Sequence, residues 1–382
     1  MPLRLSAGAC NCIRDCVVCS KATPGISVKR MKTIREDFEE REKSFISPFG
    51  VLAAESKGRV FPEDPCPVRT IFQQDRDRIV FSNAFRRLKH KTQVFLSPLG
   101  DHYRTRLTHT LEVAEVARTI SRALRLNEDL CEAVALGHDL GHTPFGHSGE
   151  TGLKEVLSGG FRHCEQSLRV VDVLERNGRG LNLSWEVRDG ILKHSKGFGD
   201  IIPADPGDMA ATVEGRIVRF ADIIAYLNHD LDDAVRSGVI SDDQLPDAVV
   251  RKLGKSHAQR STTMIRDLIY SSRETDGKLD LSFSNDIFDA MSDLRLFLYE
   301  KVYRADPVHA EFIKGKKIIT EIFEYFSSNH DQLRQRLAGL EMVEAYYNDA
   351  PDERIICDYI ASMTDRYLLD LYHEIFIPTP LV

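Results

Sequence analysis

The sequence contains no apolar run that approaches the ~20 residues that a membrane-spanning helix needs. It also lacks a convincing signal peptide, because Arg14 and Asp15 interrupt the short apolar stretches near the start. Positive charge is not in excess, since 51 Lys and Arg residues face 58 Asp and Glu residues, a net charge of −7. A chain-wide basic surface for nucleic acid is therefore excluded, and any anion site must be local. These absences predict a cytoplasmic protein with no membrane partner.

Strand-like alternation and hairpin signals are also scarce, and there is no internal repeat or low-complexity segment. Helical periodicity dominates instead. Apolar residues recur at three- and four-residue steps from Arg106 to Leu126, and Asn127 can cap a second helix that runs to His138 and Asp139. Further amphipathic runs cover residues 164–176, 213–236, 285–303, 310–326 and 352–376. The sequence predicts an all-α fold, with a bundle-like core and additional C-terminal helices.

The eight cysteines do not form a recognisable disulfide framework. Four are scattered and suit reduced, buried thiols: Cys66, Cys131, Cys164 and Cys357. The other four gather near the start: Cys10, Cys12, Cys16 and Cys19. A small metal or iron–sulfur site is one interpretation of this cluster. We favour the other, a disordered or non-native leader over residues 1–30, because the spacing matches no established ligand pattern.

Composition shifts divide the rest of the chain into three parts. Residues 31–70 are predicted to form an N-terminal helix and an extended connector that contains Pro62, Pro65 and Pro67. Residues 71–283 contain the histidine-rich motifs and are predicted to be the core. Residues 284–382 are predicted to be a C-terminal helical region packed on that core.

Seven of the 13 histidines lie between His90 and His163. His109 falls in the first turn of one predicted helix, and His138 and Asp139 close the next. An antiparallel helix pair would bring these positions together. Asp222 opens an apolar helical stretch, where packing alone explains a carboxylate poorly. Two imidazoles and two carboxylates suit Mg²⁺, Mn²⁺, Fe²⁺, Co²⁺ or Zn²⁺, whereas the alternative is that His138 and Asp139 only hydrogen-bond locally at a helix end.

This spacing resembles the signature of the HD-domain phosphohydrolase superfamily. Three strings, at residues 86–95, 104–110 and 141–147, resemble one branch, the bacterial deoxyguanosinetriphosphate triphosphohydrolase-like proteins, and the similarity spans about residues 32 to 376. The resemblance implies an HD-domain helical bundle over residues 71–283. It also implies hydrolysis of dGTP or other deoxynucleoside triphosphates to a deoxynucleoside and inorganic triphosphate, by attack of a metal-activated water on the α-phosphorus.

The resemblance implies catalytic roles for two histidines and one carboxylate. His147 matches the catalytic histidine, and Glu150, three residues later on the same helical face, matches its partner. His163 matches a second histidine that contacts the phosphates or protonates the leaving group. The alternatives are an N-terminal helix contact for the His147–Glu150 pair and a buried hydrogen bond for His163.

Substrate contacts are predicted for five residues, and His142 is a sixth candidate. Arg104 and Arg106 precede His109, so one of them should clamp the α- or β-phosphate. The resemblance places Gln93 beside the sugar 3′-hydroxyl. It places Tyr226 against the sugar, where its ring would exclude a ribose 2′-hydroxyl, and Asp230 on the 3′-hydroxyl; the alternative for this pair is ordinary core packing.

Two more histidines stay undecided between a pocket role and a structural role. His142, four residues after His138, is a phosphate contact or a supporting group around the metal, or else it is structural. His194 is a pocket residue or a packing residue.

Two other functions remain open at the level of the sequence. One is an HD-type nucleotidase or phosphodiesterase that acts on another phosphoester, and the other is a non-catalytic module for nucleotide sensing or nucleic-acid binding. The complete metal set argues against the second. Among partners, the resemblance implies a deoxynucleoside triphosphate substrate and a homo-oligomer. A regulatory nucleotide or single-stranded DNA is neither required nor excluded.

Overall fold

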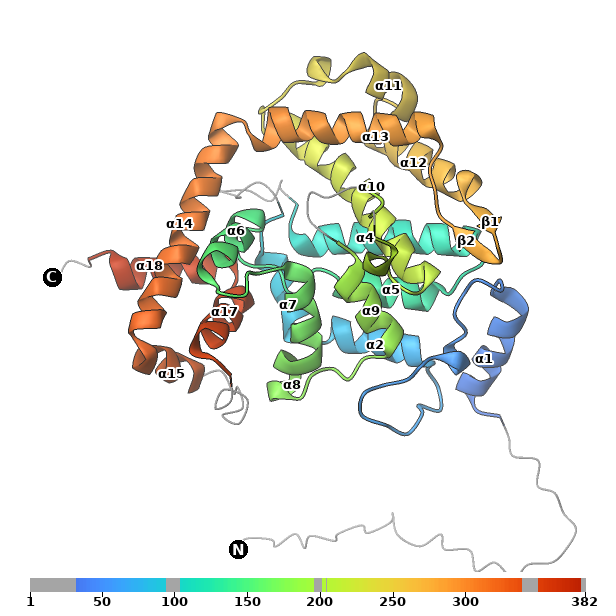
Figure 1. The fold of residues 1–382 in the computed structure, drawn as a ribbon, viewed down its shortest axis with the longest axis horizontal. Helices are drawn as coiled ribbons and strands as arrows, with labels where there is room; N and C mark the ends of the chain where they lie inside the picture. Colours follow the sequence, from blue (N-terminus) through green and yellow to red (C-terminus); the bar gives the residue numbers. More distant parts are fainter. Residues whose placement is uncertain (1–31, 94–103, 196–200, 204, 339–349, 379–382) are drawn as a thin grey trace, which may run out of the picture.

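The structure is a computed structural model that describes residues 32–93, 104–195, 201–203, 205–338 and 350–378 (Figure 1). In these residues the chain is helical, which confirms the all-α prediction. The β-structure of the described residues consists of two isolated β-bridges and one antiparallel hairpin, β1 (Arg273–Thr275) and β2 (Lys278–Asp280). None of the described helices combines the length and the apolar character needed to cross a lipid bilayer. The predicted leader over residues 1–30 lies outside the described residues.

Helices α4 (Arg106–Ala123) and α5 (Glu128–Gly137) form an antiparallel hairpin near the centre of the molecule. The Thr105 side chain caps the start of α4, and the Asn127 side chain accepts a hydrogen bond from the Leu130 N–H at 3.2 Å to cap α5. Between them Arg125 adopts a φ of 54°, which reverses the chain. The long helix α10 (Val213–Arg236) packs across both (Figure 1). The start of α4 therefore lies beside the end of α5, as the sequence predicted.

The remaining elements of the first three-quarters of the chain surround this hairpin. The helices are α1 (Ile34–Phe45), α2 (Ile71–Val80), α3 (Asn83–Arg87), α6 (His147–Val156), α7 (His163–Arg169), α8 (Glu175–Gly178), α9 (Trp185–Lys193), α11 (Asp247–Leu253) and α12 (His257–Ser271). Shorter helical turns are η1 (Ala53–Glu55), η2 (Leu88–His90), η3 (Val170–Leu174), η4 (Pro206–Asp208) and η5 (Asp242–Gln244). Between η1 and α2 the chain has no helix, and this stretch contains the three prolines of the predicted extended connector.

The first of the C-terminal helices packs against α10 and α11, and the others gather at one end of the molecule (Figure 1). The C-terminal helices are α13 (Asn285–Leu298) with its π-helical continuation η6 (Tyr299–Tyr303), α14 (Asp306–Ser328), α15 (His330–Ala338), α17 (Asp352–Ser362) and α18 (Asp365–Phe376). The sequence predicted one continuous run over residues 352–376, but the helix ends at Ser362. Met363 is extended, with ψ 158°, and the Thr364 side chain caps α18 by accepting from the Tyr367 N–H.

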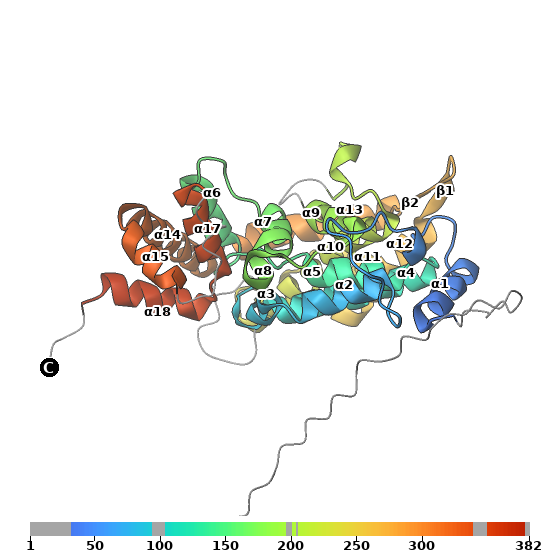
Figure 2. The same ribbon diagram turned by 90° about the horizontal axis from the view of Figure 1, so that it is seen from below.

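Buried apolar side chains form two clusters rather than one. The larger cluster extends from Ala53 to Val302 and includes the inner faces of α4, α5 and α10. The smaller one joins Phe145, Leu153, Leu157 and Phe161 to α14, α15, α17 and α18. Seen from below, α6 lies with this C-terminal group (Figure 2). The predicted division at residue 284 stays a prediction, and α6 shows that the C-terminal helices share a core with the motif-bearing part.

Lys91 and Asp365 form hydrogen bonds that link the segment before α4 to the C-terminal helices. Lys91 is almost fully buried, and its Nζ donates to the carbonyl oxygens of His142 at 2.5 Å and Ala361 at 2.8 Å. The Asp365 carboxylate accepts from the Thr92 N–H at 2.8 Å and from the Phe145 N–H at 3.1 Å. Burial, together with the nearby charge of Arg87, lowers the pKa of Lys91 to about 7.

This shifted pKa predicts a stability that depends on pH. Below pH 7 Lys91 is protonated in both the folded and the unfolded chain. The free energy of unfolding is then reduced by the whole cost of burying the charged ammonium group. Between about pH 7 and the ordinary lysine pKa, only the unfolded chain keeps the proton. The contribution of Lys91 to the free energy of unfolding should therefore rise by up to about 1.4 kcal/mol per pH unit.

Substitution Lys91→Met isolates this contribution, because methionine fills a similar volume without titrating. We expect the free energy of unfolding of the natural chain, relative to the variant, to increase between pH 7 and pH 9 in urea titrations. A difference that stays constant across this range would contradict the buried, titrating lysine.

Candidate active site

The four predicted metal ligands lie together at the junction of α4, α5 and α10. His109 Nε2 is 3.2 Å from Asp222 Oδ1 and 3.7 Å from Asp139 Oδ2. His138 caps the end of α5, and its Nε2 is 3.3 Å from Asp139 Oδ1. One ligand atom from each of His109, His138 and Asp222 lies within 4.8 Å of the other two. The structure thus brings into contact four residues that span more than 110 positions of sequence.

The donor atoms of this cluster fit a divalent cation. The ring of His138 faces the Ala135 carbonyl with Nδ1 at 2.6 Å, so Nδ1 carries the proton and Nε2 keeps its lone pair. That Nε2 is buried and has no hydrogen-bond partner among the described residues. A buried lone pair aimed at two carboxylates is what a metal ligand requires and what packing alone does not explain. The mixed nitrogen and oxygen set suits Mg²⁺, Mn²⁺, Fe²⁺, Co²⁺ or Zn²⁺.

Both carboxylates of the cluster are held in the ionised form. Burial alone would raise the pKa of Asp139, but the charges of His138, His142 and Arg106 outweigh burial and hold it well below its usual range. Burial opposes ionisation of Asp222 as well, and there the hydrogen bond and charge of His109 lower the pKa. The cluster therefore offers negative charge to a cation at neutral pH.

Arg106 belongs to this cluster more closely than the sequence suggested. Its side chain is fully buried, and Nη1 donates to Asp139 Oδ2 at 2.9 Å. Nη2 donates to the Gln93 carbonyl at 3.5 Å. Arg104, in contrast, is held by Glu112 at 2.8 Å and by Asp233 at 3.3 Å. Of the two arginines predicted to clamp a phosphate, the structure places Arg106 at the cluster and pairs Arg104 with carboxylates.

A second group of histidines adjoins the metal-type cluster. The rings of His142 and His163 stack at 4.0 Å between centroids, and His142 Nε2 is 3.2 Å from Asp139 Oδ1. His194 lies next to His163, with its Nε2 3.2 Å from His163 Nε2. Burial lowers the pKa of His194 to about 3, and the charges of His138 and His163 contribute. His194, which the sequence left undecided, is therefore a neutral part of this group.

Glu150 pairs with His163 more closely than with His147. Its Oε1 accepts from the His163 backbone N–H at 2.9 Å and lies 3.0 Å from His163 Nδ1. His147 Nδ1 is 3.6 Å from Glu150 Oε2, and the His147 side chain is half exposed. Burial lowers the pKa of His163, but the Glu150 charge outweighs burial and raises it above its usual value. The geometry favours a protonated His163, whereas the catalytic role of His147 stays a prediction.

Close backbone packing brings this histidine group to the end of α5. A Cβ on Gly141 would lie 2.1 Å from the Ser167 backbone nitrogen, so only glycine lets α7 approach here. The Ser167 hydroxyl donates to the His138 carbonyl at 2.6 Å and accepts from the Gly141 N–H at 2.9 Å. Helix α7, which begins at His163, is thereby fixed beside the cluster.

The three residues predicted to contact the sugar differ in their burial and in their hydrogen-bond partners. Gln93 is half-buried beside Arg106, and its side-chain oxygen has no hydrogen-bond partner among the described residues. Tyr226, one turn after Asp222, is half-buried, and burial followed by the charges of Asp222 and Asp230 raises its pKa. Asp230 is buried, and its Oδ2 accepts from the Tyr303 hydroxyl at 2.5 Å. The sugar contacts of all three stay predictions, and Asp230 already has protein partners.

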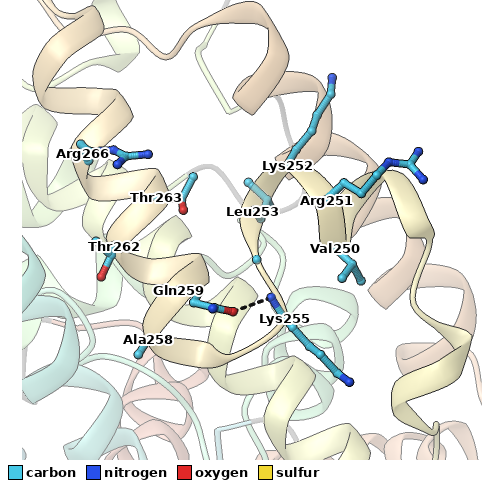
Figure 3. Close-up of a pocket in the computed structure, with 11 residues that line it drawn as sticks. Val250, Arg251, Lys252, Leu253, Lys255, Ala258, Gln259, Thr262, Thr263 and Arg266 are labelled. Atoms are coloured by element: carbon cyan, nitrogen blue, oxygen red, sulfur yellow. Dashed lines mark hydrogen bonds between the residues drawn. The ribbon is translucent and has the colours of Figure 1, made fainter.

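A separate open pocket of about 620 Å³ lies between the end of α11 and the outer face of α12 (Figure 3). Arg251, Lys252 and Lys255 extend from its rim, and Arg266 lines it from α12. All four are exposed, and Lys252 pairs with Asp286 at 2.9 Å. This pocket is formed by residues other than those of the metal-type cluster, and its charged groups are ordinary solvated side chains.

Comparison with known proteins agrees with this geometry. The model of the HD domain matches residues 106–227, and that of the phosphohydrolase-associated domain matches residues 281–374. A solved structure of a hypothetical protein from Aquifex aeolicus covers 80% of this chain and 68% of its own, at 20% identity and a TM-score of 0.41, too distant a likeness to add to the assignment.

Named relatives match over almost the whole chain. A deoxyguanosinetriphosphate triphosphohydrolase-like protein from Desulfatibacillum aliphaticivorans is 63% identical over 350 residues, which is 92% of this chain and 100% of the relative. One of the same name from Caldanaerobacter subterraneus subsp. tengcongensis is 53% identical over 347 residues, 91% of this chain and 97% of the relative. The chain belongs to the family of deoxyguanosinetriphosphate triphosphohydrolase-like proteins, as its sequence motifs predicted.

Proposed function

We propose that this protein hydrolyses deoxynucleoside triphosphates, dGTP or others, to the deoxynucleoside and inorganic triphosphate. Water would attack the α-phosphorus, and the ribose O5′ would leave. The observation that carries the proposal is the juxtaposition of the His109, His138, Asp139 and Asp222 cluster with the His163–Glu150 pair. Family membership supports the same class of substrate.

His109, His138, Asp139 and Asp222 would hold the divalent cation. When bound there, such a cation supplies Lewis-acid polarisation of a phosphate oxygen and lowers the pKa of water. Two ionised carboxylates, Asp139 and Asp222, would make this position negative even though Arg106 pairs with Asp139, and Asp139 is closed to solvent. Arg106 also keeps the Asp139 carboxylate in one orientation, since the pair is buried on both sides.

His163 is suited to supply a proton to the leaving O5′. Glu150 raises the pKa of His163 and holds its Nδ1 side, so the imidazolium is stabilised in a fixed orientation. Nε2 is directed to the neutral His194 in this structure. His147, half exposed at the start of α6, is the alternative proton carrier that the family resemblance suggests.

Tyr226 supports a preference for deoxyribose. It lies one turn after Asp222 on α10, so its ring would face a sugar whose phosphate is held at the cluster. A ring packed against C2′ would leave no space for a ribose hydroxyl. A cytoplasmic location and a homo-oligomer are part of the same proposal, and the homo-oligomer rests on the family resemblance of the sequence.

The test is a product assay with the four deoxynucleoside triphosphates and the four ribonucleoside triphosphates. We expect triphosphate release from deoxy substrates after chelator treatment and readdition of Mg²⁺, Mn²⁺, Fe²⁺, Co²⁺ or Zn²⁺ in turn, and no release with chelator alone. Release of pyrophosphate or orthophosphate would instead support an HD-type enzyme for another phosphoester. Turnover that persists in chelator would contradict the metal-dependent mechanism.

A further inference from the structure

Behind His109, a line of buried polar groups leads away from the metal-type cluster. His109 Nδ1 is 2.8 Å from His229 Nε2, and the two rings meet edge to face with centroids 4.9 Å apart. His229 Nδ1 is 2.8 Å from Asp230 Oδ1, a bent contact between neighbours in sequence that is mainly electrostatic. Asp230 Oδ2 accepts from the Tyr303 hydroxyl at 2.5 Å. The line therefore runs from His109 through His229 and Asp230 to Tyr303.

The contacts allow one arrangement of protons if His109 is a metal ligand. His109 must then keep its Nε2 lone pair for the cation, so its proton sits on Nδ1 and is donated to His229 Nε2. His229 accepts at Nε2 and therefore carries its own proton on Nδ1, beside the Asp230 carboxylate. Both histidine rings are buried, so water does not compete for these positions. His229 would thus fix the tautomer of His109, and Asp230 would fix that of His229.

We propose that His229 is a positioning residue that fixes the tautomer and the ring orientation of His109, with Asp230 and Tyr303 as its support. The inference rests on the proposed function, because it requires His109 to bind the cation. It gives Asp230 a task other than the predicted contact with the sugar. A ligand whose second nitrogen donates to a polarised acceptor is a better electron donor to the metal.

The line also connects two parts of the chain. His229 and Asp230 lie on α10, at the end of the HD core, whereas Tyr303 lies on η6, which joins α13 to α14 (Figure 1). Residues 281–374 match the phosphohydrolase-associated domain. Through Tyr303, that domain would contribute to the orientation of a metal ligand that it does not itself contain.

The test measures metal binding rather than turnover. Metal-free protein would be titrated with Co²⁺, and affinity would be obtained by competition with a chelator together with the visible absorption of the bound ion. We expect His229→Leu to weaken Co²⁺ binding by about 10- to 100-fold and to change the spectrum. His229→Gln returns an acceptor near the Nε2 position, so its affinity should lie within about fivefold of the natural chain.

Two further variants separate positioning from general packing. Tyr303→Phe removes one supporting hydrogen bond and should weaken Co²⁺ binding by about fivefold. His257, on α12, lies outside this line and pairs with Asp232 at 2.7 Å. His257→Leu should therefore leave the Co²⁺ affinity unchanged. If His229→Leu does not fold, the Co²⁺ affinities and spectra of His229→Gln and Tyr303→Phe test the proposal instead.

Three outcomes would overturn the proposal: unchanged affinity and spectrum in His229→Leu, a loss of thermal stability alone, or an equal effect of His257→Leu. The control for the proposed function is His109→Ala. If that variant binds Co²⁺ as tightly as the natural chain, the metal centre itself is misassigned. If His109→Ala loses the ion while His229→Leu keeps it unchanged, only the role of His229 fails.

Discussion

The variant Asp139→Asn should lose hydrolysis by about 10³-fold in kcat, which corresponds to roughly 4 kcal/mol of transition-state stabilisation. The substitution preserves the shape of the side chain but removes the charge that faces His138, His109 and Arg106. Without that charge the cluster should not retain a divalent cation. Steady-state turnover of a deoxynucleoside triphosphate, measured together with bound metal per chain, checks both effects.

The substitution also leaves Arg106 as a buried cation without its partner, so it should destabilise the fold by up to about 3–5 kcal/mol. A matched control separates this cost from the loss of chemistry. Asp75 is equally buried and pairs with Arg59 at a position outside the cluster. Asp75→Asn should lower the stability similarly and leave turnover of the folded protein close to that of the natural chain. Equal activity losses in the two variants would remove Asp139 from the mechanism.

Glu150→Gln should lower kcat by about 10²-fold, because it removes the charge that keeps a nearby histidine protonated. In the structure that histidine is His163, whose pKa is raised by Glu150 against the effect of burial. Loss of the carboxylate lowers this pKa, so the protonated form persists only to a lower pH. The high-pH limb of the rate profile should therefore move toward lower pH. An unshifted limb would show that Glu150 does not control the essential acid.

The same experiment in two backgrounds identifies the histidine. If the proton is held on His163, then in His163→Gln the further substitution Glu150→Gln should have little additional effect on the profile. If the proton is held on His147, the shift should persist in His163→Gln and disappear in His147→Gln. The distances of 3.0 Å to His163 and 3.6 Å to His147 predict the first result.

The sequence was sufficient to predict the hairpin that builds the metal-type cluster. The apolar periodicity of α4 and α5 and the Asn127 cap define two adjacent helices, and a short turn between them forces an antiparallel pair. His109 and His138 are consequently close in space. Asp222 was identified by a different signal, a carboxylate in an apolar stretch, because such a charge needs a partner.

Other features depend on packing between segments that no local pattern connects. The partner of Glu150 was predicted from helical spacing to be His147, but α7 approaches through Gly141 and places His163 closer. One of Arg104 and Arg106 was expected to clamp a phosphate, and the structure pairs Arg104 with Glu112 and Asp233. Such choices among nearby partners are decided by tertiary distances, which spacing along one helix does not encode.

Two histidines to which the sequence gave no definite role share one property. His194 follows the last residue of α9, and His229 lies on α10 directly before Asp230, so neither stands in a metal-ligand spacing with the HD motif. His194 contacts cluster residues because α9 packs on α5 and α7, and His229 contacts His109 because α10 packs on α4. The break between α17 and α18 was missed for a local reason, since Thr364 is a helix cap in a stretch that is otherwise amphipathic.

The most direct test of the central claim is hydrolysis of a deoxynucleoside triphosphate in ¹⁸O-labelled water, followed by mass spectrometry of both products. Attack at the α-phosphorus, next to a cation held by His109, His138, Asp139 and Asp222, predicts one ¹⁸O atom in inorganic triphosphate and none in the deoxynucleoside. Label in the deoxynucleoside, or in released pyrophosphate or orthophosphate, would contradict the account.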